Sequence, residues 1–150
     1  MSVDIRTLDA SDEASKAQLD ALKKEVWPKA DEEHFGADLH PHFFHTAEAT
    51  LVYEENGQLL GYLEVRCELG VAYMGSTGIV EQARRRGVAT KLVEAAENWA
   101  RENYCHKVTA ETGTEWTSKG LVTAMGYTPV VTFKRHFGKI DFIVFEKFLD

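Results

Sequence analysis

The sequence lacks long apolar runs, and it contains only two cysteines. No stretch approaches the roughly 20 consecutive apolar residues of a membrane-spanning helix, so we expect no membrane association. Residues 1–6 lack the basic stretch and apolar core that open a signal peptide. Cys67 and Cys105 lie far apart without metal-ligand or redox spacing, which favours reduced, partly buried thiols. Together these absences predict a cytoplasmic protein.

The sequence also has no excess of basic residues, since its net charge is −7. That sign disfavours general nucleic-acid binding. Residues 1–81 hold 16 acidic and 6 basic side chains, whereas residues 82–150 hold 8 acidic and 11 basic. This division suits a protein that binds a cationic ligand with one half and an anionic ligand with the other. Chance together with the demands of solubility explains it equally well.

The composition, 44% hydrophobic and 27% charged over 150 residues, is ordinary for one folded domain, here residues 1–150. Ser11 or Asp12 can cap a first helix, which should end before Pro28. The order of elements predicts an α/β (α+β) fold, a mixed sheet with helices on its faces. Further helices are expected at residues 31–39, 86–103 and 117–125, and strands at residues 3–8, 49–54, 59–69, 71–80, 108–112, 128–137 and 140–148.

Glycines mark the turns and irregularities of these strands. Asn56-Gly57 is a strong hairpin signal, and Gly138-Lys139 indicates a second hairpin near the C-terminus. Gly75 and Gly78 fall inside a predicted strand, where glycine often marks a bulge or a close approach of two backbones.

Three consecutive arginines, Arg84, Arg85 and Arg86, stand where a strand turns into the longest predicted helix. Cations at a helix N-terminus oppose the macrodipole, each by on the order of 0.3–1 kcal/mol. A bound anion would reverse that sign, because arginines and free backbone N–H groups would converge on it. Gly87 and the small Ala89 allow the close backbone approach that a diphosphate requires. A solvated basic helix start is the alternative.

Other phosphate-binding loops fit this segment less well. The sequence contains neither a Walker loop nor the three spaced glycines of a Rossmann fingerprint. The pattern Arg84-x-x-Gly87-x-Ala89 resembles the Q/R-x-x-G-x-G/A signature of the GNAT acetyltransferases, and Gly126-Tyr127 stands where that family often has Gly-Phe. The order of elements is similar over essentially the whole chain. The resemblance implies a mostly antiparallel sheet of six to seven strands with about four helices on its faces.

The resemblance also implies an N-acetyltransferase with acetyl-CoA as its cosubstrate. The strands at residues 71–80 and 108–112 would splay apart, and the pantetheine arm would pair with the first of them at Ile79 and Val80. One departure is Val122, which stands where many relatives place a tyrosine that protonates the departing thiolate. The amides that wrap the pyrophosphate would be those of Arg84, Arg85, Arg86, Gly87, Val88, Ala89 and Thr90.

Within the superfamily the sequence resembles the aminoglycoside 6′-N-acetyltransferases, through Trp27-Pro28, residues 61–67 and Met125-Gly126-Tyr127 among other stretches. Gly75 departs from them, since many carry a glutamate there. The resemblance implies a small cationic amine as acceptor, with a protein or peptide amine, or a non-catalytic acyl-CoA-binding module, as alternatives, and it is compatible with a homodimer. The acceptor-binding residues would be Trp27, which otherwise belongs to the core, Glu33, Glu64, Glu68 and Tyr73.

Acetyl transfer requires a neutral amine, whereas an alkyl ammonium titrates near 10.4, so a base should assist. Glu111 is the first candidate, because its strand edge should border the open cleft. Glu64 and Glu68 are alternatives, and an ordinary solvated carboxylate remains the other interpretation of Glu111. Tyr127 and Tyr73 are candidates for the acid or for packing. No nucleophile has a predicted activating partner, which favours direct attack in a ternary complex.

Four histidines gather in one stretch, at residues 34, 40, 42 and 45. Imidazoles bind zinc well, but no cysteine or carboxylate completes a tight spacing here. We therefore predict no metal site and expect an exposed or acceptor-facing loop.

Overall fold

The structure, a computed structural model, describes residues 6–26, 42 and 44–149. The chain divides into two compact units, Met1–His40 and Pro41–Asp150, and each is described by itself. The predicted strand at residues 3–8 is described only from residue 6 on, and residues 6–8 form no strand. The predicted helix at residues 31–39 lies outside the described residues.

In the first unit, helix α1 spans Glu13–Val26. Asp12 caps it, because one carboxylate oxygen accepts the amide of Ser15 at 3.0 Å and the other accepts its hydroxyl at 2.6 Å. These hydrogen bonds from Ser15 lower the pKa of Asp12. Of the two predicted caps, Asp12 is therefore the one that the structure confirms.

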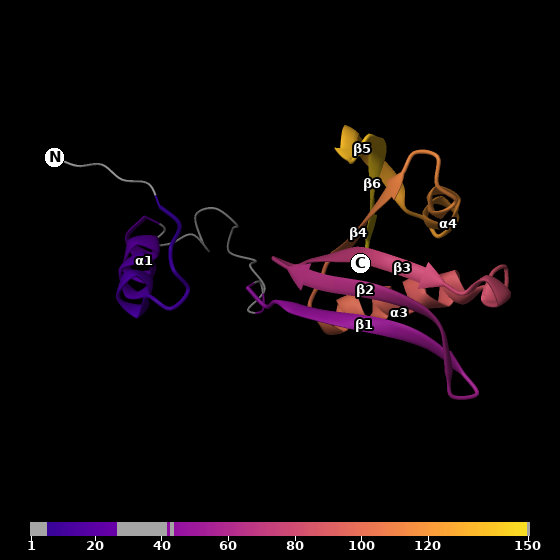
Figure 1. The fold of residues 1–150 in the computed structure, drawn as a ribbon, viewed down its shortest axis with the longest axis horizontal. Coiled ribbons are helices and arrows are strands. Elements are labelled where there is room, and N and C mark those ends of the chain that lie inside the picture. The colour runs from indigo at the N-terminus through magenta and orange to yellow at the C-terminus, as the bar shows by residue number, and fades with distance from the viewer. Residues whose placement is uncertain (1–5, 27–41, 43, 150) are drawn as a thin grey trace. The chain divides into compact units, whose positions relative to one another are not determined.

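The second unit is a six-stranded sheet with the order β1-β2-β3-β4-β6-β5 (Figure 1). All neighbouring strands run antiparallel except β3 and β4, which are parallel. This confirms the predicted mixed, mostly antiparallel sheet. Its strands are β1 Ala47–Glu55, β2 Gln58–Glu68, β3 Val71–Ile79, β4 Lys107–Gly113, β5 Thr128–Phe137 and β6 Ile140–Phe148.

Three further helical segments follow β3 and β4. They are the 3-10 helix η1 at Glu81–Ala83, helix α3 at Val88–Glu102 and helix α4 at Ser118–Ala124. The described residues thus hold three α-helices, where about four were expected. None of these helices is both long and apolar enough to cross a membrane.

The predicted hairpins are present. Asn56 and Gly57 join β1 to β2 with φ angles of 52° and 77°, the left-handed pair that a tight type I′ turn needs. Gly138 and Lys139 join β5 to β6. The local twist of such turns matches the twist of the strands that they connect, which is why two residues suffice.

The glycines inside β3 also act as expected. Leu63 pairs with Thr77 but Val65 pairs with Met74, so β3 carries one extra residue next to Gly75. A side chain at Gly78 would meet the ring of Tyr62 at 2.5 Å. One glycine therefore lies at a bulge, and the other lets a tyrosine ring lie close against the strand.

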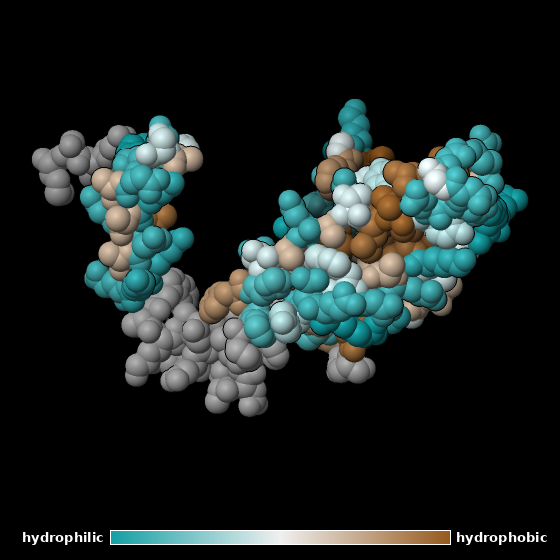
Figure 2. Space-filling model, turned by 90° about the horizontal axis from the view of Figure 1, so that it is seen from below, coloured by the Kyte–Doolittle hydropathy of each residue, from teal (hydrophilic) through white to brown (hydrophobic). Residues whose placement is uncertain are grey.

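Helix α3 packs on the sheet and closes the core. Its buried positions recur at helical spacing and contact inward residues of the central strands, whose side chains alternate between the two faces of the sheet. On the face in Figure 2, hydrophobic side chains gather in one area of this unit within a hydrophilic surround. The core residues from α3 are Val88, Leu92, Val93, Ala96 and Ala100, and those from the strands include Leu63, Val65, Ala72, Val108 and Phe145.

Candidate functional site

The centre of the sheet opens where β3 and β4 part. The two strands pair only from Val71–Lys107 to Met74–Ala110. Beyond that point β3 stays with β2 as far as Ile79, whereas β4 continues beside β6 (Figure 1). The bulge beside Gly75 begins just after the last shared pair. The structure thus confirms the predicted splay and leaves two facing strand edges without a strand between them.

The loop after β3 presents backbone N–H groups at the start of α3. The amide of Lys91 donates the first helical hydrogen bond, to the carbonyl of Gly87 at 3.1 Å. The amides of Val88, Ala89 and Thr90 therefore have no carbonyl one turn earlier within the helix. Free N–H groups combined with the positive end of the helix dipole form a site suited to an anion.

Gly87 leaves open space beside these backbone N–H groups. Its φ of 76° is left-handed, and no heavy atom lies within 4 Å of where its side chain would begin. Arg85, at φ 60°, is left-handed too. Two such residues cannot continue a helix, so α3 begins at Val88 rather than near Arg86 as expected. The three arginines lie in the turn that precedes the helix.

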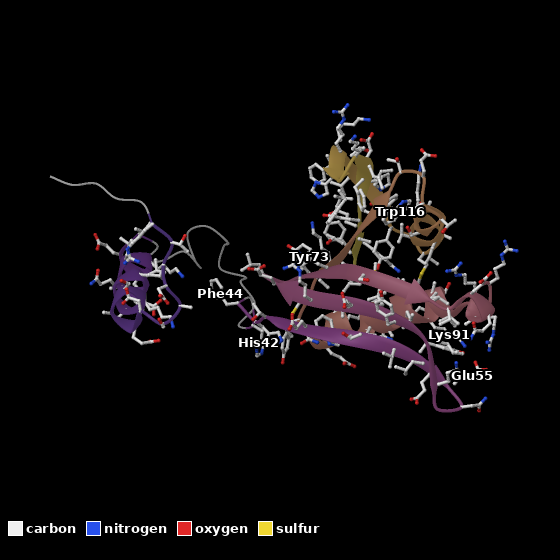
Figure 3. All side chains as sticks on the ribbon, viewed as in Figure 1. His42, Phe44, Glu55, Tyr73, Lys91 and Trp116 are labelled. Carbon is white, nitrogen blue, oxygen red and sulfur yellow. The ribbon has the colours of Figure 1, made fainter. Side chains whose placement is uncertain are left out.

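The arginines of this turn divide into two roles. Nε of Arg84 donates to the carbonyl of Ile79 at 3.2 Å, and Nη2 of Arg86 lies 2.6 Å from Oε2 of Glu55. Glu55 is the last residue of β1, and Figure 3 labels both Glu55 and Lys91 of α3. For Arg85, the described part of the chain provides no hydrogen bond or ion pair. Its guanidinium is therefore available to an anion held by the loop.

At the end of β3, two neighbouring residues differ in what their backbone can still bind. The amide of Val80 donates to the carbonyl of Leu60 at 3.0 Å, so it is already used by β2. Backbone groups alternate between the two sides of a strand, so those of Ile79 face the open edge, where its carbonyl accepts Nε of Arg84 and its amide remains for a ligand. Of the two residues expected to pair with an extended ligand, Ile79 is thus the better placed.

A cleft of about 1020 Å³ lies on the second unit, around the point where β3 and β4 part. The predicted Glu64, Tyr73 and Glu111 line it together. Tyr73 is labelled in Figure 3, together with Trp116. The sequence did not single out the other principal lining residues. These are Glu48, Arg66, Trp116, Phe137, Ile140 and Phe142.

The cleft combines carboxylates with aromatic rings. Its charged lining residues are three glutamates and one arginine, Arg66, whose guanidinium lies 4.8 Å from the centre of the Tyr73 ring. Trp116 and Phe142 meet edge to face with ring centres 5.1 Å apart. Such a lining suits a ligand that carries positive charge on an apolar or ring-shaped body.

Glu111 is the first residue of β4 beyond its last pair with β3. It lines the cleft, and its side chain is 43% exposed. Its Oε2 lies 3.5 Å from Nε2 of His136 on β5, a residue that the sequence did not indicate. A carboxylate at the fork of the strands can accept a proton from a group bound in the cleft.

The other predicted site residues lie elsewhere. Trp27 and Glu33 fall outside the described residues. Glu68 is exposed at the end of β2 and does not line the cleft. Of the histidines, His45 pairs with Asn103 at 2.9 Å and His42 stacks on Tyr104. Within the described residues, no group of three potential ligands is arranged to hold a metal ion.

Tyr127 lies in the core rather than in the cleft. It is 2% exposed, and its hydroxyl donates to Oε1 of the buried Glu97 at 3.1 Å. Lys147 donates to the same oxygen at 2.9 Å. Burial, and then the neighbouring Glu97, raise the pKa of Tyr127. This placement favours packing over catalysis, so Tyr127 is not kept as a catalytic candidate.

We expect Tyr127→Phe to lower the free energy of unfolding by about 1–2 kcal/mol, because one buried hydrogen bond to a charged group is lost. Glu97 would keep Lys147 as its partner. Acetyl transfer by the variant should proceed at the wild-type rate. Denaturant unfolding and a steady-state assay measure the two quantities. A large fall in kcat with unchanged stability would return Tyr127 to the catalytic machinery.

Comparison with known proteins decides the family. The sequence pattern described as Acetyltransferase (GNAT) family matches residues 16–120. The chain belongs to the GNAT family. A GNAT enzyme transfers an acyl group from acyl-CoA to an amine, with acetyl-CoA as cosubstrate. The chain is an acyl-CoA-dependent N-acetyltransferase.

Individual relatives agree with this assignment. The chain is 30% identical over 139 residues to aminoglycoside N(6′)-acetyltransferase type 1 of Klebsiella aerogenes, covering 84% of this chain and 90% of the relative. An acetyltransferase from Bacillus cereus shares the fold with a TM-score of 0.67 at 15% identity, over 97% of this chain and 98% of the other. A crystal structure from Agrobacterium tumefaciens shares the fold with a TM-score of 0.63 at 19% identity, over 99% of both chains.

The loop of this GNAT chain fits a coenzyme A pyrophosphate. The amides at the start of α3 and the guanidinium of Arg85 suit the charge of a diphosphate, and the open space beside Gly87 leaves room for its approach. Val122, which stands in place of the tyrosine of many relatives, is buried in the core and offers no proton. The proton that restores the thiol must come from another group or from solvent.

Proposed function

We propose that the chain transfers the acetyl group of acetyl-CoA to a primary amine on a small cationic acceptor, such as an aminoglycoside, by direct attack. Glu111 is the proposed base. The observation that supports this assignment is its position at the point where β3 and β4 part, inside the cleft. That point joins the open strand edges, where the pantetheine arm would lie, to the carboxylate-lined cleft, where the amine would lie.

The cosubstrate carries negative charge, and a cationic loop would hold it, in contrast to the carboxylate-lined cleft that would hold the amine. The loop at residues 84–90 would bind the pyrophosphate through the amides of Val88, Ala89 and Thr90 and through Arg85. Ile79 would pair with the pantetheine arm at the open edge of β3. Arg84 and Arg86 would brace the loop through Ile79 and Glu55 instead of binding the anion directly.

Glu111 would remove the proton that keeps the amine unreactive. An alkyl ammonium is almost fully protonated at neutral pH, and only the free amine can attack a carbonyl carbon. A carboxylate within reach accepts that proton as the carbon–nitrogen bond forms. No covalent acyl-enzyme is required, because Cys67 and Cys105 are both buried in the core.

The acceptor class is inferred from the lining of the cleft. Glu48 and Glu64 lie on adjacent strands and would attract ammonium groups, while Tyr73 and Trp116 offer ring faces to the body of the acceptor. The named relative acts on an aminoglycoside, a polycationic molecule. Peptide amines are the second candidate acceptors.

The acceptor is tested by measuring thiol released from acetyl-CoA with a panel of aminoglycosides, polyamines and lysine-containing peptides. We expect turnover with the polycationic sugars and little with peptides. Turnover on peptides alone would contradict the proposed acceptor class.

The double substitution Glu48→Gln and Glu64→Gln is expected to raise KM for a polycationic acceptor by roughly 10- to 100-fold, because two attractive charges in the cleft are lost. KM for acetyl-CoA should not change. Glu68→Gln is the matched control, since Glu68 is exposed on the same strand as Glu64 but outside the cleft. An equal effect of both variants would mean that overall charge, and not the cleft, attracts the acceptor.

A further inference from the structure

Strand β5 carries an enlarged bulge, and one of the bulged residues lies beside Glu111 of β4. Phe133 pairs with Phe142 and Phe137 pairs with Ile140, so residues 134–136 stand opposite the single residue Asp141. An enlarged bulge of this kind, with three residues opposite one, bends the strand and redirects its side chains. Bulges beside active sites often direct a side chain toward the reacting groups.

Asp141 holds the bulge in shape. Its Oδ1 accepts the amide of Arg135 at 2.9 Å, and its Oδ2 accepts Nζ of Lys134 at 2.8 Å. Arg135 has a left-handed φ of 49°, a conformation that non-glycine residues rarely adopt without a stabilising contact. The hydrogen bond from Lys134, followed by that from the Arg135 amide, lowers the pKa of Asp141.

The bulge directs His136 at Glu111. Nε2 of His136 lies 3.5 Å from Oε2 of Glu111, and the imidazole is stacked on Phe133 with ring centres 4.9 Å apart. Phe137 meets the same ring edge to face at 5.5 Å, and Phe142 is tilted to it at 6.1 Å. The imidazole is therefore held by three aromatic rings beside the cleft.

We propose that His136 is a positioning residue that orients Glu111 and carries its proton to solvent during acetyl transfer. The proposal rests on the proposed role of Glu111 as base. The distance of 3.5 Å is longer than a good hydrogen bond, and a small rotation of the half-exposed carboxylate would close it. Catalytic hydrogen bonds commonly tighten only once substrate is bound.

The proton balance of the reaction shows which proton His136 would carry. An ammonium group loses two protons as it becomes an amide, while the carbon–nitrogen bond forms and the carbon–sulfur bond breaks. One proton restores the thiol of coenzyme A, and the other leaves for solvent. Glu111 must lose its proton before the next turnover. While a bound acceptor lies against Glu111, the partly exposed imidazole of His136 offers that proton a way to water.

Of the described charged groups near His136, Glu111 is the one that can form an ion pair with its imidazole. Glu111 faces it from β4, and Asp141 on β6 is already engaged by Lys134 and by the Arg135 amide. Lys134 and Arg135 adjoin it within β5. Among the described residues, Glu111 is the carboxylate within ion-pair distance of its ring.

The test compares His136→Gln, Glu111→Gln and the double variant in a steady-state assay from pH 5.5 to 9.5. We expect His136→Gln to lower kcat by roughly 10- to 100-fold at neutral pH, and added imidazole to restore part of it. The loss should shrink toward high pH, where a growing fraction of the amine is neutral without help. The double variant should be no slower than Glu111→Gln, because the two residues act in series. His45→Gln is the control, since His45 bonds Asn103 and does not line the cleft.

The two hypotheses fail in different ways. If Glu111→Gln retains wild-type kcat, the base is wrong, and the role of His136 falls with it. If Glu111→Gln loses activity while His136→Gln keeps the wild-type kcat and pH profile, only the relay is overturned. A constant loss across the whole pH range without rescue by imidazole would also overturn the relay, because it indicates a purely structural effect.

Discussion

Replacement of Gly87 by glutamate is expected to abolish acetyl-CoA binding in a protein that still folds. The new carboxylate would begin in the open space where the pyrophosphate is proposed to lie, beside the amides of Val88 and Ala89. Like charges in contact cost several kcal/mol, so we expect affinity to fall at least about 100-fold. Titration calorimetry with acetyl-CoA measures this directly.

The change at Gly87 also carries a conformational cost, which a matched variant isolates. Gly57 has φ 77° against 76° for Gly87, and neither has a heavy atom within 4 Å of its missing side chain. Both glutamate variants should lose roughly 1–2 kcal/mol of stability from the left-handed backbone. Only Gly87→Glu should lose acetyl-CoA binding. Unchanged affinity in that variant would mean that the loop does not hold the pyrophosphate.

Glu111→Gln is expected to lower kcat by roughly 10²- to 10⁴-fold at neutral pH, the usual effect of losing a general base. Glutamine keeps the shape of the side chain but cannot accept the proton. Because Glu111 is half-exposed at the end of β4, stability should change by no more than about 0.5 kcal/mol. The affinity for acetyl-CoA, measured by calorimetry, should equal that of the wild type.

Glu64→Gln separates the two carboxylates that the sequence left as alternatives for the base. Both line the same cleft, but Glu111 lies on β4, whereas Glu64 lies on β2 beside the bulge at Gly75. Glu64→Gln should chiefly raise KM for the acceptor, whereas Glu111→Gln should chiefly lower kcat. If the two effects are exchanged, Glu64 is the base and Glu111 an acceptor-binding residue.

Features that depend on a few neighbouring residues were predictable. Asn56-Gly57 indicated its hairpin because both positions need a left-handed backbone, which these two residue types tolerate best. The first helix cap was predicted at Ser11 or Asp12 for a similarly local reason, and the structure selects Asp12. The start of α3 was predicted two residues too early, since nothing in the sequence showed that Arg85 would adopt a left-handed conformation.

The sequence by itself predicted the hairpins and the loop at residues 84–90, because each follows from spacing, residue type and charge along a short stretch. The mixed sheet was predicted from the order of elements over the whole chain. Only the tertiary structure decided which side chains lie together in the cleft. Strand order brings Glu48, Glu111 and Trp116 together from three distant segments, and a three-residue bulge directs His136 at Glu111. The same folding buries Tyr127 against Glu97. These contacts depend on strand register and on the face of the sheet to which each side chain points. A shift of the register by one residue moves a side chain to the opposite face.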